Sequence, residues 1–168
     1  KLIKGEENNF KITTLKDIFK KEVFYGIGFD VHRLVPGKKM YLGGIKIKSK
    51  LGTLGHSDGD PVLHALTDAI LGACKMGDIG EKFSDKSKRY KNIRSTILLN
   101  KVMKDVKSKN FDVNNIDINI ITETPKIKKI KKKLILSISK LCKISKNKIN
   151  IKGKTAEKLG VIGKEKAI

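Results

Sequence analysis

The chain has 168 residues, of which 39 % are hydrophobic and 33 % charged, a composition typical of one folded domain with a buried core. Lys and Arg number 38 against 17 Asp and Glu, and the net charge of +21 at pH 7 raises nucleic acid, an anionic membrane or a phosphorylated substrate as partners. The sequence holds no apolar run near the ~20 residues that a membrane-spanning helix needs. Two distant cysteines, Cys74 and Cys142, do not indicate a disulfide framework, and we expect both to be buried thiols.

Residues 1–22 are polar and rich in lysine, and we expect an extension that is either disordered or the remnant of a transit peptide. Residues 23–32 are rich in β-branched and aromatic side chains and predict a strand. A turn at Pro36-Gly37 separates it from a second, antiparallel strand over residues 40–47. Within that strand, Gly43-Gly44 indicates a bulge or a close approach of another backbone.

The strongest helix signal is Asp60-Pro61, where Asp is a typical N-cap and Pro a typical first helical residue. Apolar residues then recur with a helical period, and we expect the helix to end at Gly77. The remaining pattern predicts a helix over 95–109, a strand over 115–122, a helix over 127–143 and a strand over 148–152. This order predicts an α+β fold, a two-layer sandwich in which helices cover one face of a small mixed or antiparallel sheet.

The three histidines, His32, His56 and His64, all lie in two short stretches of the chain. Asp30 and His32 are two residues apart, so on a strand their side chains leave the same face, and His64 lies one turn into the predicted helix. One carboxylate and two imidazoles suit a zinc ion with an open coordination position, as in catalytic zinc sites. Asp68, one turn beyond His64, is predicted to accept a hydrogen bond from an imidazole. The alternative is an ordinary polar pair at a strand end and a solvated Asp68.

Three further segments have both a functional and a structural interpretation. Residues 56–60 either present His56 and backbone N–H groups to an anion or form the turn before the helix. Lys126 opens a lysine-rich helix and either binds a phosphate together with the helix N-terminus or belongs to a solvated face. In residues 152–160, Glu157 either holds a Mg²⁺ that bridges phosphates or belongs to a polar loop.

Several short motifs follow one another along the chain: Gly-Phe-Asp-Val-His (28–32), Leu-Gly-Gly (42–44), His-Ser-Asp-Gly-Asp (56–60), Leu-His-Ala-Leu-Thr-Asp-Ala (63–69), Gly-Asp-Ile-Gly (77–80), Phe-Ser-Asp (83–85), Pro-Lys (125–126) and Glu-Lys-Leu-Gly (157–160). In this order and spacing they resemble the 2-C-methyl-D-erythritol 2,4-cyclodiphosphate synthase family. The resemblance covers residues 23–168, which we expect to form the synthase domain.

The resemblance implies a lyase of non-mevalonate isoprenoid biosynthesis that assembles as a homotrimer with active sites at subunit interfaces. It implies the substrate 4-diphosphocytidyl-2-C-methyl-D-erythritol 2-phosphate, whose 2-phosphate attacks the β-phosphorus, closes the cyclodiphosphate ring and expels CMP. It also implies one Zn²⁺ per subunit, held by Asp30, His32 and His64, and a Mg²⁺ or Mn²⁺ held by Glu157.

By position in the matching motifs, His56 and Thr155 are implied to align the phosphates and stabilise the transition state. A larger set is implied to bind the substrate: Ser57, Asp78, Gly80, Asp85, Thr122, Lys126, Ile127, Lys128, Gly153 and Lys154.

The chain departs from the family's pattern at Lys154 and Ala156, where hydroxyl residues are common, and at Val161 and Lys164, where an aromatic residue and an Arg often face the trimer axis. The family's final strand is also expected to be missing from this sequence. We expect a plastid-type organelle if the source is eukaryotic and the cytoplasm otherwise.

The alternative function is a basic nucleic-acid-binding module, based on the charge of +21 and the lysines of residues 126–133. Few aromatic residues and no recognised binding motif weigh against it. The leading hypothesis therefore expects a small nucleotide substrate and neither nucleic acid nor a membrane as a partner.

Overall fold

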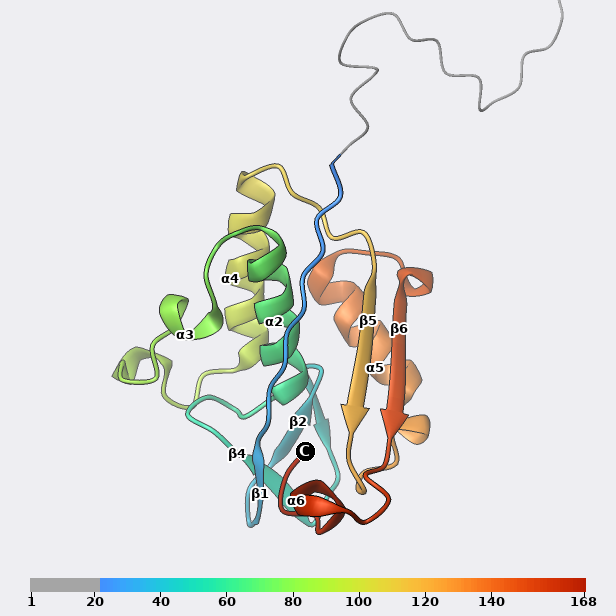
Figure 1. Cartoon of the computed structure of the whole chain (residues 1–168). Helices are drawn as coiled ribbons and strands as arrows, with labels where there is room; N and C mark the ends of the chain where they lie inside the picture. The colour runs from blue at the N-terminus through green and yellow to red at the C-terminus, as the bar shows by residue number, and fades with distance from the viewer. Residues whose placement is uncertain (1–21) are drawn as a thin grey trace, which may run out of the picture.

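The computed structural model describes residues 22–168, so the predicted extension lies outside the described residues except for its last residue (Figure 1). The strands are β1 (Arg33–Pro36), β2 (Met40–Leu42), β3 (Ile45–Ile47), β4 (Leu51–Leu54), β5 (Ile116–Ile121) and β6 (Ile149–Lys154). The helices are α2 (Pro61–Ala73), α3 (Ile79–Lys82), α4 (Ser95–Ser108), α5 (Ile127–Cys142) and α6 (Gly160–Gly163), with short 3₁₀ helices η1 (Lys88–Tyr90) and η2 (Lys146–Lys148). Among the described residues, no helix is both long and apolar enough to cross a membrane.

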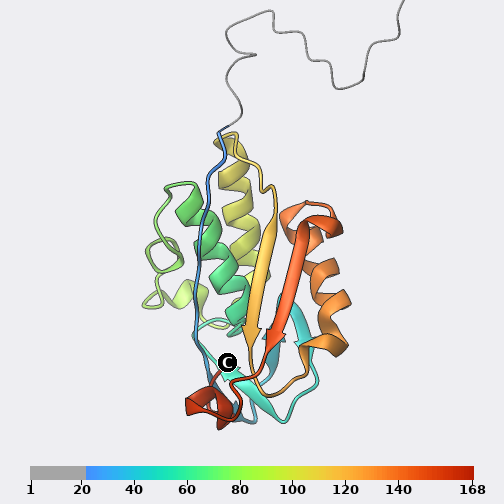
Figure 2. The same ribbon diagram turned by 45° about the vertical axis from the view of Figure 1, so that its right-hand side comes forward.

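The described strands form three two-stranded ladders instead of the one small sheet expected from the sequence. Strand β1 pairs antiparallel with β4, β2 pairs antiparallel with β3, and β5 pairs parallel with β6. Helix α5 connects β5 to β6, because a parallel pair needs a crossover, and it packs against β6 (Figure 2). The structure thus combines helices with small parallel and antiparallel ladders. It agrees with the predicted α+β class but not with a single sheet.

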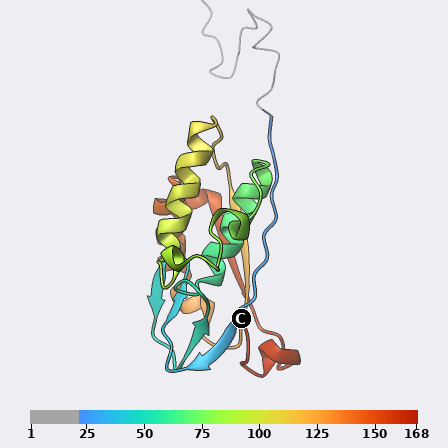
Figure 3. The same cartoon turned by 90° about the vertical axis from the view of Figure 1, so that its left-hand side faces the viewer.

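The first predicted strand is extended but lies outside any ladder over most of its length. In the described part of the chain, its ladder-like pairing begins at His32, which exchanges two backbone hydrogen bonds of 3.0 Å with Ile168. Residues 22–31 run alongside α2 instead (Figures 1 and 3). The β-branched and aromatic composition correctly indicated extended backbone, but the composition of one segment cannot identify the neighbouring strand that a ladder needs.

Two glycines let this extended segment lie directly on the backbone of α2. A Cβ atom at Gly26 would lie 1.8 Å from the carbonyl oxygen of Ala69, and one at Gly28 would lie 1.9 Å from that of Ala65. Only glycine permits so close an approach. Because side chains alternate along extended backbone, Asp30 leaves the segment on the same side as Gly28, toward α2.

Residues 40–47 form a hairpin and not the single bulged strand that was expected. Gly43 and Gly44 have φ angles of 57° and 83°, and Leu42 pairs with Ile45 across them. Two consecutive positive φ angles are those of a type I′ turn, whose twist matches that of the flanking strands. The glycine pair therefore reverses the chain.

Helix α2 begins where predicted, with Asp60 as its N-cap, but it ends at Ala73 and not near Gly77. Lys75 has a left-handed φ of 54°, and its N–H and the next one bond back to carbonyl groups in the last helical turn. This is the Schellman pattern of a helix end, with lysine in the position that glycine usually holds.

The apolar faces of α2, α4 and α5 meet those of the strands in one core. Its fully buried members include Leu42, Leu63, Leu71, Leu99, Val102, Leu134, Ile138 and Ile151.

Asp60 joins the β2–β3 hairpin to α2 inside this core. Its carboxylate is fully buried and accepts hydrogen bonds from the N–H groups of Gly43 (2.9 Å), Gly44 (2.6 Å) and Leu63 (3.0 Å). Burial raises the pKa of Asp60, and the three N–H donors act in the opposite direction. One carboxylate thus satisfies donors at the start of the helix and in the turn of the hairpin.

Replacing Asp60 by alanine leaves these buried N–H groups without an acceptor, so we expect Asp60→Ala to lower the free energy of unfolding by about 3 kcal/mol. Urea unfolding followed by circular dichroism measures the loss. Asp85→Ala is the matched control, because it removes an exposed carboxylate and should cost less than about 0.5 kcal/mol. Equal losses in the two variants would contradict the role assigned to Asp60.

Candidate functional site

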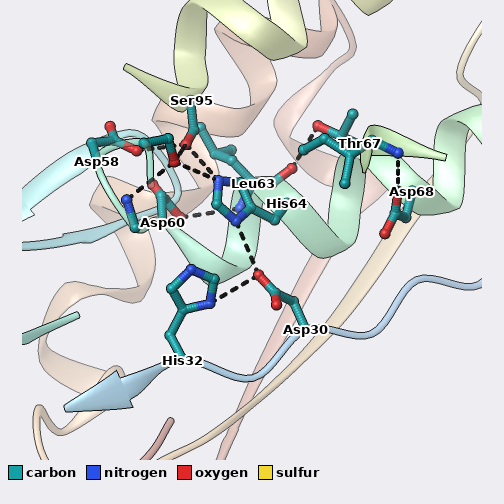
Figure 4. A network of polar contacts seen from close by, with 12 residues as sticks. Asp30, His32, Asp58, Asp60, Leu63, His64, Thr67, Asp68 and Ser95 are labelled. Atoms are coloured by element: carbon teal, nitrogen blue, oxygen red, sulfur yellow. Dashed lines mark hydrogen bonds and ion pairs between the residues drawn. The ribbon is translucent and has the colours of Figure 1, made fainter. Parts of the chain in front are cut away.

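Asp30, His32 and His64 meet where the extended N-terminal segment crosses α2 (Figure 4). One oxygen, Asp30 Oδ2, lies 3.0 Å from His64 Nδ1 and 3.1 Å from His32 Nδ1. The ligand atoms of the three residues all lie within 4.8 Å of one another, and all three side chains are half-buried. The structure therefore brings together the three residues predicted to bind a metal, from two separate elements.

The donor atoms of this triad fit a divalent metal ion. His32 Nδ1 is buried and has no aligned hydrogen-bond partner among the described residues, although it lies 3.1 Å from Asp30 Oδ2. A buried imidazole nitrogen that faces a carboxylate oxygen without an aligned hydrogen bond is typical of a site shaped for a cation. Two imidazoles and a carboxylate are also a usual ligand set for zinc.

The triad keeps Asp30 ionised. Burial alone would raise the pKa of Asp30, but contacts with His32 and His64 and the attraction of both rings outweigh burial and hold it below its usual value. A carboxylate held in its charged form is ready to act as a metal ligand.

Local structure explains why these three side chains converge. Gly28 seats the extended segment on α2, which places Asp30 beside the helix two residues later. Asp60 caps α2, and the His64 N–H bonds to the Asp60 carbonyl at 3.1 Å, so His64 projects from the first helical turn. The position of the triad thus depends on one close backbone contact and one helix start.

Asp68 does not contact an imidazole as was predicted. Its Oδ1 accepts a hydrogen bond of 2.7 Å from the N–H of Ile79 and links α2 to α3 (Figure 4). His64 Nε2 instead lies 3.0 Å from Ser57 Oγ and 2.9 Å from Ser95 Oγ. Helical spacing placed Asp68 on the correct face of α2, but the loop that enters α3 takes up its carboxylate.

A second candidate site lies at the ends of β5 and β6 and the start of α5. A hollow of about 390 Å³ is lined there by the predicted residues Thr122, Lys126, Ile127, Lys128, Gly153, Lys154 and Thr155, and also by Pro125, Lys131, Ile151 and Lys152. Strands β5 and β6 and helix α5 converge here, because β5 leads into α5 and β6 returns parallel to β5. Lys131 was not predicted to line this hollow, although it lies one helical turn beyond Ile127 and Lys128.

Glu157 and Thr155 lie together in the exposed loop after β6, where the Thr155 hydroxyl donates a hydrogen bond to the Glu157 carboxylate. Glu157 has a left-handed φ of 49°. Within the described residues, Glu157 is not part of the triad, and no triad residue lines the hollow. The single chain therefore presents two separate candidate sites.

The other predicted residues are exposed: His56 precedes α2, Asp78 and Gly80 lie at the start of α3, and Asp85 follows α3. His56 Nε2 lies 3.3 Å from the carbonyl oxygen of Ser87, and Asp78 caps α3 by accepting a 2.8 Å hydrogen bond from the Glu81 N–H.

The cysteines do not supply a nucleophile. Burial raises the pKa of Cys142 to about 12 and also raises that of the half-buried Cys74. Neither thiol is activated for attack at neutral pH.

Comparison with known proteins places the chain in a family. The sequence pattern described as the YgbB family matches residues 23–168. The "Bifunctional enzyme IspD/IspF" of Pelagibacter ubique is 68 % identical over 169 residues, which cover 100 % of this chain and 46 % of that protein. The chain thus spans about half the length of this relative.

Two further proteins match over most of their own length. The "2-C-methyl-D-erythritol 2,4-cyclodiphosphate synthase" of Treponema denticola is 48 % identical, and the match covers 85 % of this chain and 89 % of that protein. The solved structure "IspF (Plasmodium falciparum) CDP complex" has a TM-score of 0.77 at 39 % identity, covering 89 % of this chain and 92 % of the other. With a family pattern that spans residues 23–168 and relatives this similar, the chain belongs to the YgbB family.

Proposed function

We propose that this chain is a 2-C-methyl-D-erythritol 2,4-cyclodiphosphate synthase, which converts 4-diphosphocytidyl-2-C-methyl-D-erythritol 2-phosphate to the cyclodiphosphate and CMP. The observation that carries the proposal is the convergence of Asp30, His32 and His64 in a member of this family. The relative from Treponema denticola bears the name of this activity, and the Plasmodium falciparum structure is named as a CDP complex. A CDP ligand is related to the cytidine diphosphate part of the proposed substrate.

The reaction needs no covalent intermediate with the protein. An oxygen of the 2-phosphate forms a bond to the β-phosphorus, the bond from that phosphorus to the bridging oxygen breaks, and CMP leaves with the bridging oxygen. Both reacting groups are anionic, so the protein must hold them close together and neutralise their charge. This demand agrees with a site that offers lysines and metal ligands but no activated thiol.

We assign Zn²⁺ to the triad, where Asp30, His32 and His64 would hold it. Glu157 would hold a Mg²⁺ or Mn²⁺ beside the diphosphate, since a carboxylate suits either ion. When bound, these ions act as Lewis acids that polarise phosphate oxygens. The chain's own residues fix the donor atoms, and Asp30 remains charged for this purpose.

The hollow at the start of α5 is proposed to take the cytidine and its phosphates. Lys126 precedes the first turn of α5, where the helix N-terminus adds positive potential, and Lys128 lines the same hollow. A Cβ atom at Gly153 would lie 2.5 Å from Ile127 Cβ, so glycine lets β6 approach the start of α5 closely. Backbone groups of Thr122, Ile127, Gly153 and Lys154 would contact the base and phosphates.

The remaining predicted residues are assigned by position. His56 and Thr155 would align the phosphates during attack. Ser57, Asp78, Gly80 and Asp85 would contact the rest of the substrate.

We further propose that the chain forms a homotrimer with each active site between subunits. The extended segment carries a row of apolar side chains that are strongly exposed in the single chain: Tyr25 (86 %), Ile27 (93 %) and Phe29 (78 %). Rows of this kind mark association surfaces. The separation of triad and hollow on one chain also favours a site that is completed by another copy.

No comparison supports the alternative of a nucleic-acid-binding module. The two curated relatives named above are bacterial, which favours a bacterial setting over a plastid.

The purified chain should contain about one zinc per polypeptide after dialysis, because three aligned protein ligands bind zinc tightly. Metal content by inductively coupled plasma mass spectrometry checks this. His32→Ala should lose the zinc, whereas His56→Ala should keep it, because His56 lies outside the triad. Zinc loss in neither variant, or in both, would refute the assignment.

The chain with Zn²⁺ and Mg²⁺ should release CMP from the proposed substrate. Phosphorus NMR should show the cyclodiphosphate appearing together with CMP. His64→Ala should lower the rate by more than about 100-fold, since losing the Lewis acid costs several kcal/mol of transition-state stabilisation. No CMP from the zinc-loaded native chain would contradict the proposed function.

Sedimentation equilibrium should give a native mass three times the 18.7 kDa of one chain. A charge at the most exposed apolar position, Ile27→Asp, should shift the population toward monomer. Ile97→Asp, at an exposed apolar position on α4, is the control and should remain trimeric. A monomeric native chain would rule out the trimer.

A further inference from the structure

A chain of polar contacts leads away from the metal-binding triad on the far side of His64 (Figure 4). His64 Nδ1 faces Asp30, and His64 Nε2 lies 2.9 Å from Ser95 Oγ. Ser95 Oγ lies 2.5 Å from Asp58 Oδ1, and the other oxygen of Asp58 accepts a 2.7 Å hydrogen bond from Arg94 Nε. These contacts link the imidazole to the ion pair between Asp58 and Arg94, which lies outside the triad.

Chemistry fixes the direction of the hydrogen bonds along this chain. The Asp58 carboxylate is paired with the guanidinium of Arg94 and can only accept, so the single hydroxyl proton of Ser95 points to Asp58. Ser95 Oγ is then available to His64 only as an acceptor. His64 Nε2 must therefore carry a proton, so Nδ1, which lies 3.0 Å from Asp30 Oδ2, is the nitrogen left to offer a lone pair to a cation held between them.

Ser57 does not reverse this conclusion. Its hydroxyl lies 3.0 Å from His64 Nε2 and could donate to an unprotonated nitrogen. In that arrangement, Nε2 and Ser95 Oγ would face each other at 2.9 Å as two acceptors, which repel. A proton on Nε2, shared between the two serine oxygens, avoids the repulsion.

The far end of the chain is anchored in the fold. Asp58 is almost fully buried, with 4 % of its side chain exposed. Arg94 also donates a 2.9 Å hydrogen bond to the Gly44 carbonyl, and its guanidinium lies 4.0 Å from the centre of the Tyr41 ring. The β2–β3 hairpin thus positions Arg94 through the Gly44 carbonyl. Arg94 in turn pairs with Asp58, which accepts the Ser95 hydroxyl proton.

We propose that Asp58 and Ser95 are positioning residues that hold His64 with its proton on Nε2 and its Nδ1 lone pair directed at the metal. The proposal rests on the metal site of the proposed function. It assigns no contact with substrate to either residue. Groups that orient a ligating imidazole typically change metal affinity by 10- to 100-fold when they are removed.

Asp58→Asn tests the proposal most directly, because it keeps the shape of the side chain and changes the direction of the hydrogen bonds. The amide can donate to Ser95 Oγ, which frees the serine proton to point at His64 Nε2 and favours a proton on Nδ1 instead. We expect zinc to bind about 10- to 100-fold more weakly, measured by competition with a chromogenic chelator. Ser95→Ala should show a similar loss. Ser95→Thr, which keeps a hydroxyl, should keep most of the zinc affinity of the native chain.

Thr67→Val is the matched control, because it removes a buried hydroxyl from α2 whose hydrogen bond, among residues 22–168, goes to the Leu63 carbonyl of the same helix. Its zinc affinity should equal that of the native chain. Circular dichroism establishes that each variant is folded, and ¹H–¹⁵N NMR of the zinc-loaded native chain identifies the His64 nitrogen that carries the proton.

Native-like zinc affinity in both Asp58→Asn and Ser95→Ala would overturn the proposal, as would coordination of zinc through His64 Nε2. A native chain that binds no zinc would overturn it too. If the variants lose affinity as expected but the zinc-loaded native chain releases no CMP, the positioning role stands and the proposed function fails. If CMP is released while the variants bind zinc normally, the function stands and the positioning role fails.

Discussion

The rest of the site depends on the hydrogen bonds that the buried carboxylate of Asp60 accepts from three backbone N–H groups. This carboxylate fixes the start of α2, which places His64 in the first helical turn, and it also binds the turn of the β2–β3 hairpin through Gly43 and Gly44. The carbonyl of Gly44 in turn receives Arg94, which holds Asp58 behind His64. The position of His64 on α2 and the groups behind its Nε2 therefore both depend on one buried side chain.

The second constraint is steric. Gly26 and Gly28 bring the extended segment so close to α2 that no Cβ atom would fit, and Asp30 and His32 follow on the same segment. A metal site needs its donors held within fractions of an ångström, and backbone contact supplies this more rigidly than packing of long side chains. The same segment turns its large apolar side chains outward, so the element that orders the triad also offers the surface proposed for assembly.

Local signals in the sequence indicated the three longer helices and offered Asp30, His32 and His64 as one of two interpretations, but they missed the end of α2 and the short helices α3 and α6. The start of α2 follows from Asp60-Pro61, and α4, α5, β5 and β6 lie within a few residues of their predicted bounds. Pairing could not be predicted, because whether extended residues 23–32 join a ladder depends on a neighbour far away in the sequence. Asp58 and Ser95 were missed for the same reason: the first has the composition of a turn and the second that of a helix start, and their contact joins residues 37 positions apart.

The central claim is that Asp30, His32 and His64 form one preorganised metal site. Anomalous X-ray diffraction at the zinc edge, on crystals of the zinc-loaded chain, tests it most directly. The account predicts one strong peak per chain, about 2.0–2.2 Å from an oxygen of Asp30 and a nitrogen of each histidine, with His64 contributing Nδ1. A strongest peak elsewhere on the chain, with the three side chains bonded only to one another, would contradict it.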